Sequence, residues 1–154
     1  MHRPQFAQAW ALFQAVLGDG TVAAVGNLIG GKVKVNIDAK IFTNACALRM
    51  SYVLNRTGVR IHPRANQTVS GGDHFHYYFR VKDLLGFLRH TFGKPDAILP
   101  GSNTTALTRK KGLLVFDVAV WRDATGHATL WDGVSCSDHC YFLEAKRLLF
   151  WALS

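Results

Sequence analysis

A group of reactive side chains lies near the C-terminal end of the chain. Residues 125–142, TGHATLWDGVSCSDHCYF, contain two histidines, two cysteines and two aspartates. Such a set could bind zinc, close a disulfide loop or supply part of a catalytic centre. A third cysteine, Cys46, lies far earlier in the chain, so the cysteine count offers one pair and one lone thiol.

Cys46 has a position that suits a nucleophile. The segment 43–58, TNACALRMSYVLNRTG, has the apolar spacing of a helix, with Thr43 or Asn44 able to cap its start and Gly58 after its end. If Asn44 is the cap, Cys46 is about the second helical residue, where unpaired backbone N–H groups and the helix dipole favour a thiolate. A buried and unreactive cysteine is the alternative interpretation.

His127 is the matching candidate base, and it needs an acidic side chain to orient its imidazole. On a regular strand, Asp132 leaves the face opposite to His127. If a short hairpin turn pairs Arg122 with His127, Asp117 lies opposite Asp132 and also faces away. Asp138 lies beyond the strand, where the chain can fold back. We therefore predict that Asp138 contacts His127.

Cys136 and Cys140 bracket Asp138 in the sequence CSDHC. A disulfide between them would hold this bend and fix the direction of Asp138. The alternative is a tetrahedral zinc site with ligands drawn from Cys136, His139, Cys140 and either His127 or the pair His74 and His76. Three residues between the cysteines, with no second cysteine pair, make a weak zinc signal, and from the residues alone both interpretations stay open.

The elements that must position these side chains indicate an α+β fold, because helices come early and strands come late without regular alternation. Helices are predicted over 6–17, 43–58 and 81–92. Loops are predicted over 59–79 and over 26–42, the latter with a short strand because Val33, Val35 and Ile37 alternate with polar residues. A hairpin is predicted from strands 113–121 and 127–131 with a turn at 122–126. The apolar run 148–153 is interpreted as a final strand, with the end of a helix begun near Tyr141 as the alternative.

Composition limits the class of protein. With 154 residues, 49% of them hydrophobic and 18% charged, the chain is expected to form a single domain over residues 1–154. The net charge of +8 attracts anionic partners, but the basic residues are scattered, and the run RKK at 109–111 is typical of a solvated turn rather than a nucleic-acid site. No apolar run reaches the ~20 residues of a membrane span, and no cleavable signal peptide is recognised.

Six segments, in the same order, resemble the fourth family of type VI secretion amidase effectors, which are bacterial toxins that cut peptidoglycan. They are IGGKVKVNI, FTNACALRMSYVLNRTG, VKDLLGFLRHTFGKPD, GHATLWDG, CSDHCYF and FWAL. The pairing of NACALRMSYVLN with GHATLWDG is the most specific part of this resemblance. The segments 60–78 and 97–111 contribute nothing to it.

The resemblance implies a fold and a set of site residues. The fold would be papain-like, of the NlpC type, with N-terminal helices packed on a small antiparallel sheet. Cys46 would be the nucleophile, His127 the general base and then acid, and Asp138 the residue that orients the imidazole. Cys136 and Cys140 would form a disulfide beside the site. No cofactor and no metal are expected.

The resemblance also implies a substrate, partners and a route. The substrate would be the peptidoglycan stem peptide, cut between the γ-carboxyl of D-glutamate and meso-diaminopimelate. A cognate immunity protein would block the cleft. The protein would be made in the cytoplasm without a cleaved signal and injected by the type VI apparatus into the periplasm of a target cell, without binding nucleic acid or inserting into a membrane. The alternatives are a basic non-enzymatic binding module with a zinc or disulfide staple and a papain-like acyltransferase.

Overall fold

The structure is a computed structural model that describes residues 2–118 and 126–154. Its helices are α1 (Phe6–Leu17), α2 (Val22–Ile29), α3 (Gly31–Asp38), α4 (Cys46–Arg56), α5 (Val81–Phe92) and the short 3-10 helix η1 (Thr105–Leu107). Its strands are β1 (Thr68–Ser70), β2 (His76–Tyr78), β3 (Ala97–Pro100), β4 (Gly112–Asp117), β5 (Gly126–Trp131) and β6 (Arg147–Ala152). The predicted α+β class is confirmed.

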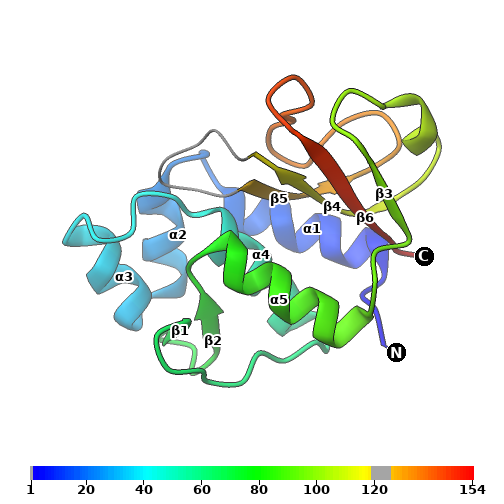
Figure 1. The fold of residues 1–154 in the computed structure, drawn as a ribbon. Helices are drawn as coiled ribbons and strands as arrows, with labels where there is room; N and C mark the ends of the chain where they lie inside the picture. The colour runs from blue at the N-terminus through cyan, green and yellow to red at the C-terminus, as the bar shows by residue number, and fades with distance from the viewer. Residues whose placement is uncertain (1, 119–125) are drawn as a thin grey trace.

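The strands form two antiparallel sheets, β1-β2 and a four-stranded sheet in the order β3-β6-β4-β5. Helices α1, α4 and α5 lie against one face of the four-stranded sheet (Figure 1). Helix α4 is central: it is buried continuously from Cys46 to Asn55 and packs against α1, α5, β2 and β5. A helix surrounded in this way can hold a side chain at its first turn in a fixed place relative to β5.

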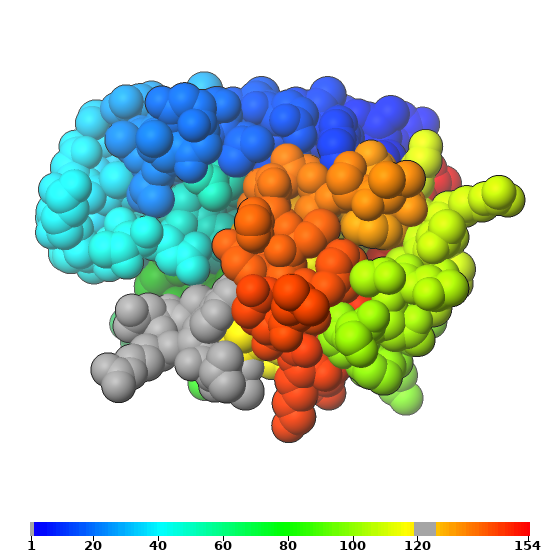
Figure 2. All heavy atoms as spheres, turned by 90° about the horizontal axis from the view of Figure 1, so that it is seen from above, coloured from blue at the N-terminus to red at the C-terminus, as the bar shows by residue number. Residues whose placement is uncertain are grey.

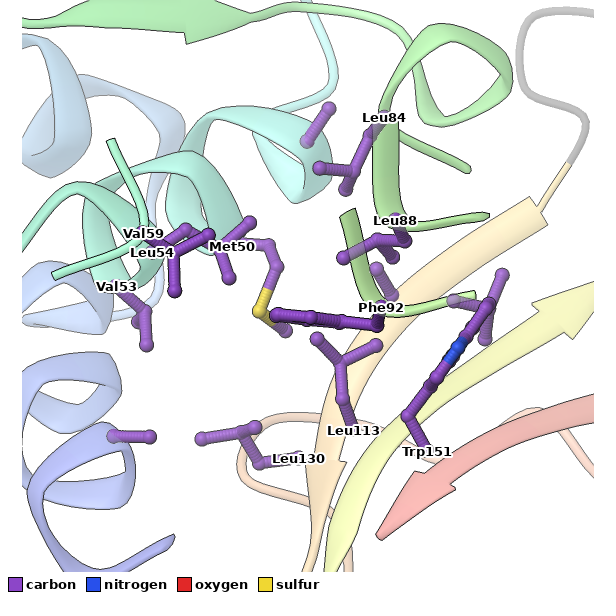
Figure 3. Close-up of a cluster of buried hydrophobic side chains, with 14 of the residues drawn as sticks. Met50, Val53, Leu54, Val59, Leu84, Leu88, Phe92, Leu113, Leu130 and Trp151 are labelled. Atoms are coloured by element: carbon purple, nitrogen blue, oxygen red, sulfur yellow. The ribbon is translucent and has the colours of Figure 1, made fainter. Parts of the chain in front are cut away.

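The main core lies between α4, α5 and the sheet. Met50 points from α4 toward Phe92 of α5, and Leu113 and Trp151 extend from the sheet into the same cluster (Figure 3). Full burial of each such side chain contributes roughly 1.5–3 kcal/mol relative to exposure. This packing fixes the distance between α4 and the sheet, and so between the elements that carry the two candidate reactive groups.

The prediction of a loop and short strand over 26–42 is wrong. Helices α2 and α3 follow each other here, separated by a sharp bend at Gly30 and Gly31, whose φ angles of 70° and 58° favour glycine. Val33 and Ile37 are buried one helical turn apart, whereas Val35 is 64% exposed. The alternation of the three residues therefore does not reflect a strand. The spacing of four between Val33 and Ile37 places both side chains on the buried face of α3.

The β4–β5 hairpin has another register than the one predicted. Phe116, not Arg122, is paired with His127. Strand β4 ends at Asp117, so the connection is longer than the short turn assumed. Residues 119–125, which include the last part of the predicted first strand and most of the predicted turn, lie outside the described residues.

The other predicted elements are confirmed, with small changes at their ends. Helices α1, α4 and α5 form where the apolar spacing placed them, and the final apolar run forms the strand β6. The segment 59–79, predicted as a loop, instead contains the two short strands β1 and β2. Among the described residues no single helix has the length and hydropathy of a membrane span; only α1 and α2 together would meet that test, and they are bent by 105°.

Candidate active site

Side chains from three elements line one cleft with a cavity volume of about 620 Å³. Cys46 is the first residue of α4, His127 is in β5, and Asp138 is in the loop after β5. The cleft is bordered by the α1–α2 connection, by the segment that leads into α4, and by β5 with its loop. Figure 2 shows these blue, cyan and orange segments meeting at one face of the molecule. The structure thus brings together the three predicted residues.

Cys46 is held at the start of α4 by its backbone and by its sulfur. Its N–H donates to Asn44 Oδ1 at 2.9 Å, and the helix cap is Ala45, so Cys46 is one position nearer the helix start than a cap at Asn44 would make it. The Ala128 N–H donates to Cys46 Sγ at 2.9 Å, and the Ala128 carbonyl accepts from Sγ at 3.4 Å. The sulfur therefore lies against the backbone of β5, next to His127.

The contact of Cys46 with Ala128 uses the free edge of the sheet. Strand β5 is an edge strand, and its outward N–H and C=O groups need partners other than a neighbouring strand. Cys46 supplies them at Ala128. At Leu130 the partner is Ser137, whose Oγ accepts from the Leu130 N–H at 3.0 Å and whose N–H donates to the Leu130 carbonyl at 2.8 Å. One strand edge thus positions both the thiol and the loop that carries Asp138.

Asp138 is the aspartate that contacts His127. His127 Nε2 lies 3.0 Å from Asp138 Oδ1 and 2.9 Å from Oδ2, which leaves Nδ1 as the ring nitrogen available to the Cys46 sulfur. Asp132 instead accepts from the backbone N–H groups of Val134 and Ser135 at 2.8 and 2.7 Å and so closes a turn.

Thr129 is a site residue that the sequence reasoning missed. Its hydroxyl donates to Asp138 Oδ1 at 2.7 Å and lies 3.0 Å from Ser137 Oγ. The signal was present, because Thr129 is two residues from His127 on the same strand and therefore shares its face. The hydroxyl gives the carboxylate of Asp138 a second hydrogen bond and fixes its orientation toward the imidazole.

Cys136 and Cys140 form a disulfide with a Cα–Cα distance of 5.6 Å, around Asp138. With both sulfurs bonded to each other, the zinc site proposed on these two thiolates is not formed. Among residues 2–118 and 126–154, no three His, Cys, Asp or Glu side chains are grouped as metal ligands would be.

The electrostatics of the site favour a charged pair. Burial acts to lower the pKa of His127, but the Cys46 sulfur and the hydrogen-bonded Asp138 carboxylate outweigh it and raise that pKa to about 10. Burial acts to raise the pKa of Asp138, but the hydrogen bonds and charge of His127 and the hydroxyl of Thr129 lower it below its ordinary value. The Cys46 sulfur and the Asp138 carboxylate thus both favour the protonated form of the His127 imidazole.

Aromatic rings enclose His127. Tyr141 packs edge-on against the imidazole with a centroid distance of 4.9 Å, and Phe116 stacks at 6.4 Å. Burial and the neighbouring charges of Asp138 and Cys46 raise the pKa of the Tyr141 phenol. Tyr141 also lines the cleft. The only signal in the sequence for its place beside His127 is that it directly follows Cys140.

Fold and site together define a class: an α+β protein in which a cysteine at a helix N-terminus meets a histidine and an aspartate from an antiparallel sheet and its following loop. Residues 42–151 match the family model described as type VI secretion system (T6SS), amidase effector protein 4, or Tae4. The chain therefore belongs to the Tae4 family of type VI secretion amidase effectors. An amidase is a hydrolase, which contradicts the alternative of a non-enzymatic binding module.

Solved structures are similar over almost the whole chain. Tae4 from Enterobacter cloacae in a Tae4–Tai4 effector–immunity complex is 42% identical with a TM-score of 0.93, covering 99% of this chain and 100% of that one. Tae4 from Enterobacter cloacae alone is 43% identical with a TM-score of 0.92, covering 99% and 98%. Tae4 in the Tae4–Tai4 complex from Salmonella Typhimurium is 42% identical with a TM-score of 0.91, covering 99% and 100%. None of the curated proteins compared with the chain matches it.

Proposed function

We propose that this amidase is a cysteine endopeptidase that cleaves the γ-D-glutamyl–meso-diaminopimelate bond of peptidoglycan stem peptides. The observation that carries the proposal is the convergence of Cys46, His127 and Asp138 in one cleft, with the histidine between the sulfur and the carboxylate. Residues 1–154 act as one catalytic domain, related to the papain-like enzymes of the NlpC type.

The acylation step follows from the charges at the site. The Cys46 thiolate attacks the γ-carbonyl carbon, and the negative charge that develops on the carbonyl oxygen lies near the positive end of α4, where first-turn N–H groups lack helical acceptors. The C–N bond then breaks, and His127 gives its proton to the departing amine of diaminopimelate. The product of this step is a thioester on Cys46.

The second step releases the enzyme. The now neutral His127 accepts a proton from water as the water attacks the thioester carbon, and the C–S bond breaks to give the Cys46 thiolate and the free γ-carboxylic acid, which loses its proton to solvent. Asp138, fixed by Thr129, holds the imidazole in the required orientation and stabilises its charged form in both steps.

The proposal extends to partners and delivery. The protein is made in the cytoplasm, is injected by the type VI apparatus into the periplasm of a target cell, and is blocked in the producing cell by a cognate immunity protein. Solved relatives in Tae4–Tai4 effector–immunity complexes support this partner. The net charge of +8 favours an acidic immunity protein.

The test uses purified muropeptides incubated with the wild type and with Cys46→Ala, with products identified by mass spectrometry. We expect the wild type alone to separate D-glutamate from diaminopimelate. Equal activity of Cys46→Ala would sink the assignment of the nucleophile, and cleavage of another bond would sink the assignment of the substrate. Products in which the acyl group is joined to an added amine, in place of water, would favour the acyltransferase alternative.

A further inference from the structure

Arg49 is a buried cation in the cleft that the proposed mechanism does not use. Its side chain is 8% exposed, and it lines the same cleft as Cys46 and His127. Since it follows Cys46 by three residues on α4, the two side chains leave the same face of the helix about 5–6 Å apart at Cβ.

The charge of Arg49 is not neutralised within the described part of the chain. Its Nη2 donates to the backbone carbonyls of Gly20 at 3.1 Å and Thr21 at 3.5 Å, and its buried Nε has no hydrogen-bond partner. None of the ion pairs among residues 2–118 and 126–154 includes Arg49. A buried cation without a carboxylate is costly, and in proteins such a charge is ordinarily paired.

Asp138, the acid that lines the cleft in the described part of the chain, is already engaged. Asp138 is bonded to His127 and Thr129, and its loop is tied to β5. In the α1–α2 connection the guanidinium is hydrogen-bonded to main-chain oxygens, and the Asp19 carboxylate there is bonded to Thr21. An anionic group that enters the cleft from outside this part of the chain could therefore pair with the guanidinium where Arg49 lines the cleft.

We infer that Arg49 binds the free α-carboxylate of the γ-linked glutamyl residue whose γ-carbonyl is attacked by Cys46. This inference rests on the proposed function. A γ-linked glutamyl residue keeps its α-carboxylate, four carbon–carbon bonds or about 5 Å from the scissile carbonyl carbon in an extended chain. That length is comparable to the Cβ spacing of side chains one turn apart on α4, which is compatible with one substrate residue contacting both side chains.

Pairing with a carboxylate would make Arg49 a specificity residue. A guanidinium forms charge-assisted hydrogen bonds with a carboxylate and has no acceptor to offer a carboxamide. The site would thus distinguish stem peptides with D-glutamate from those in which the same α-carboxyl is amidated to D-isoglutamine. A site built for one polar group rejects its analogue strongly, because a buried partner is left unpaired.

The experiment compares two synthetic peptides that differ only there, L-Ala-γ-D-Glu-meso-diaminopimelate and its D-isoglutamine analogue. We expect the wild type to cleave the acid with a kcat/KM roughly 100-fold higher than the amide. In Arg49→Gln this ratio should fall to within about threefold of one, and in Arg49→Lys part of the preference should return. Arg89→Gln, which removes the same charge from an exposed position on α5, should keep the wild-type ratio.

The ratio is measured within each variant, so it does not depend on how much of that variant is folded. A wild type that cleaves both peptides equally well would overturn the role of Arg49 while the proposed function stands. So would an Arg49→Gln variant that loses activity on both peptides but keeps the wild-type ratio, since this is the result of a purely structural role. A wild type that cleaves neither peptide would overturn the proposed function and this inference with it.

Discussion

At the scale of single residues, the site depends on two contacts of His127. Nε2 faces the carboxylate of Asp138, and the sulfur of Cys46 lies on the other side of the ring. Both partners favour the protonated imidazole, and the enclosing rings of Phe116 and Tyr141 exclude solvent that would screen the charges. Each partner therefore has an effect on His127 that can be measured separately.

The first prediction concerns the two aspartates near His127 in the sequence. Asp138→Asn should lower kcat about 10²–10⁴-fold, because a carboxamide cannot stabilise the imidazolium in the same orientation. Asp132→Asn is the matched control and should keep near wild-type turnover, since an amide oxygen can still accept from Val134 and Ser135. Initial rates on one muropeptide decide; a larger loss with Asp132→Asn would contradict the proposed triad.

The second prediction concerns the protonation of His127. In the wild type the pKa of His127 is raised to about 10, and the Cys46 sulfur is the largest favourable contribution to this rise. Removing the sulfur in Cys46→Ala should therefore lower the pKa of His127. Nuclear magnetic resonance titration of the imidazole carbon in both proteins measures the difference, and identical titration curves would show that the sulfur does not act on the ring.

The same pKa values set the sign of the pH dependence of stability. The pKa of His127 in the folded protein lies above its ordinary 6.5, so its contribution is complete below pH 6.5 and is lost as the pH rises through about 10. The pKa of Asp138 is lowered from 3.8, so its contribution is complete above pH 3.8 and is lost as the pH falls through its folded value. The free energy of unfolding of the wild type, relative to that of His127→Gln, should therefore be greatest between pH 3.8 and pH 6.5.

At the scale of elements, the edge of β5 and the loop after it decide the geometry. Three contacts hold the loop that carries Asp138. Ser137 is hydrogen-bonded to Leu130, and the side chain of Gln14 in α1 donates to the Ser137 carbonyl at 3.0 Å. The disulfide is the third contact. These contacts come from different parts of the chain. They explain why the loop can fold back on its strand without a regular hairpin of its own.

Sequence reasoning succeeded at this scale where the pattern was long and failed where it was short. Helix α4, which carries Cys46, has eleven residues, and its prediction is confirmed. Val33, Val35 and Ile37 form too short a pattern to separate a strand from a helix, and local spacing could not reveal that Gly30 and Gly31 join two helices. The register of β4 and β5 depends on the length of their connection, which periodicity does not specify.

The third prediction concerns the disulfide of the loop. Replacing Cys136 and Cys140 together by serine should lower the free energy of unfolding by about 2 kcal/mol. This is the contribution expected when a cross-link with a sequence separation of 4 no longer restricts the unfolded chain. It should lower kcat more than it raises KM, because the bend orients Asp138 and does not bind substrate. Chemical denaturation and steady-state kinetics measure the two effects.

A control for the disulfide prediction is the wild type treated with a reducing agent, which should behave like the double serine variant. If the double variant loses stability but keeps the wild-type kcat, the disulfide is a staple without influence on Asp138. Thr129→Val in β5 gives a second comparison, since it removes the hydrogen bond to Asp138 and leaves the disulfide intact.

At the scale of the whole molecule, two features matter: the central helix α4 carries the reactive thiol of Cys46, and the protein as a whole has a positive net charge. Helix α4 is enclosed by α1, α5, β2 and β5, so its N-terminus cannot shift without disturbing the main core. The charge of +8 is spread over the chain and not confined to one motif. It acts on the approach of substrate at long range, whereas the specificity inferred for Arg49 acts in contact.

The fourth prediction concerns this long-range charge. Intact peptidoglycan presents many carboxylates, and a small muropeptide presents few, so the rate on intact cell-wall sacculi should depend more strongly on salt. We expect a severalfold loss on sacculi between about 0.05 and 0.5 M salt, as the screening length shortens, and a smaller change on the muropeptide. Parallel salt profiles for the two substrates would contradict a role of the net charge.

The hydrogen bond from the Ala128 N–H to the Cys46 sulfur gives this protein an internal reporter. The amide proton of Ala128 senses directly whether the sulfur is a thiol, a thiolate or a thioester, because each differs as an acceptor. Its resonance can thus be followed during a single turnover without any added label on the cysteine. A strand edge that holds the nucleophile in place also makes each chemical state of that nucleophile visible from the backbone.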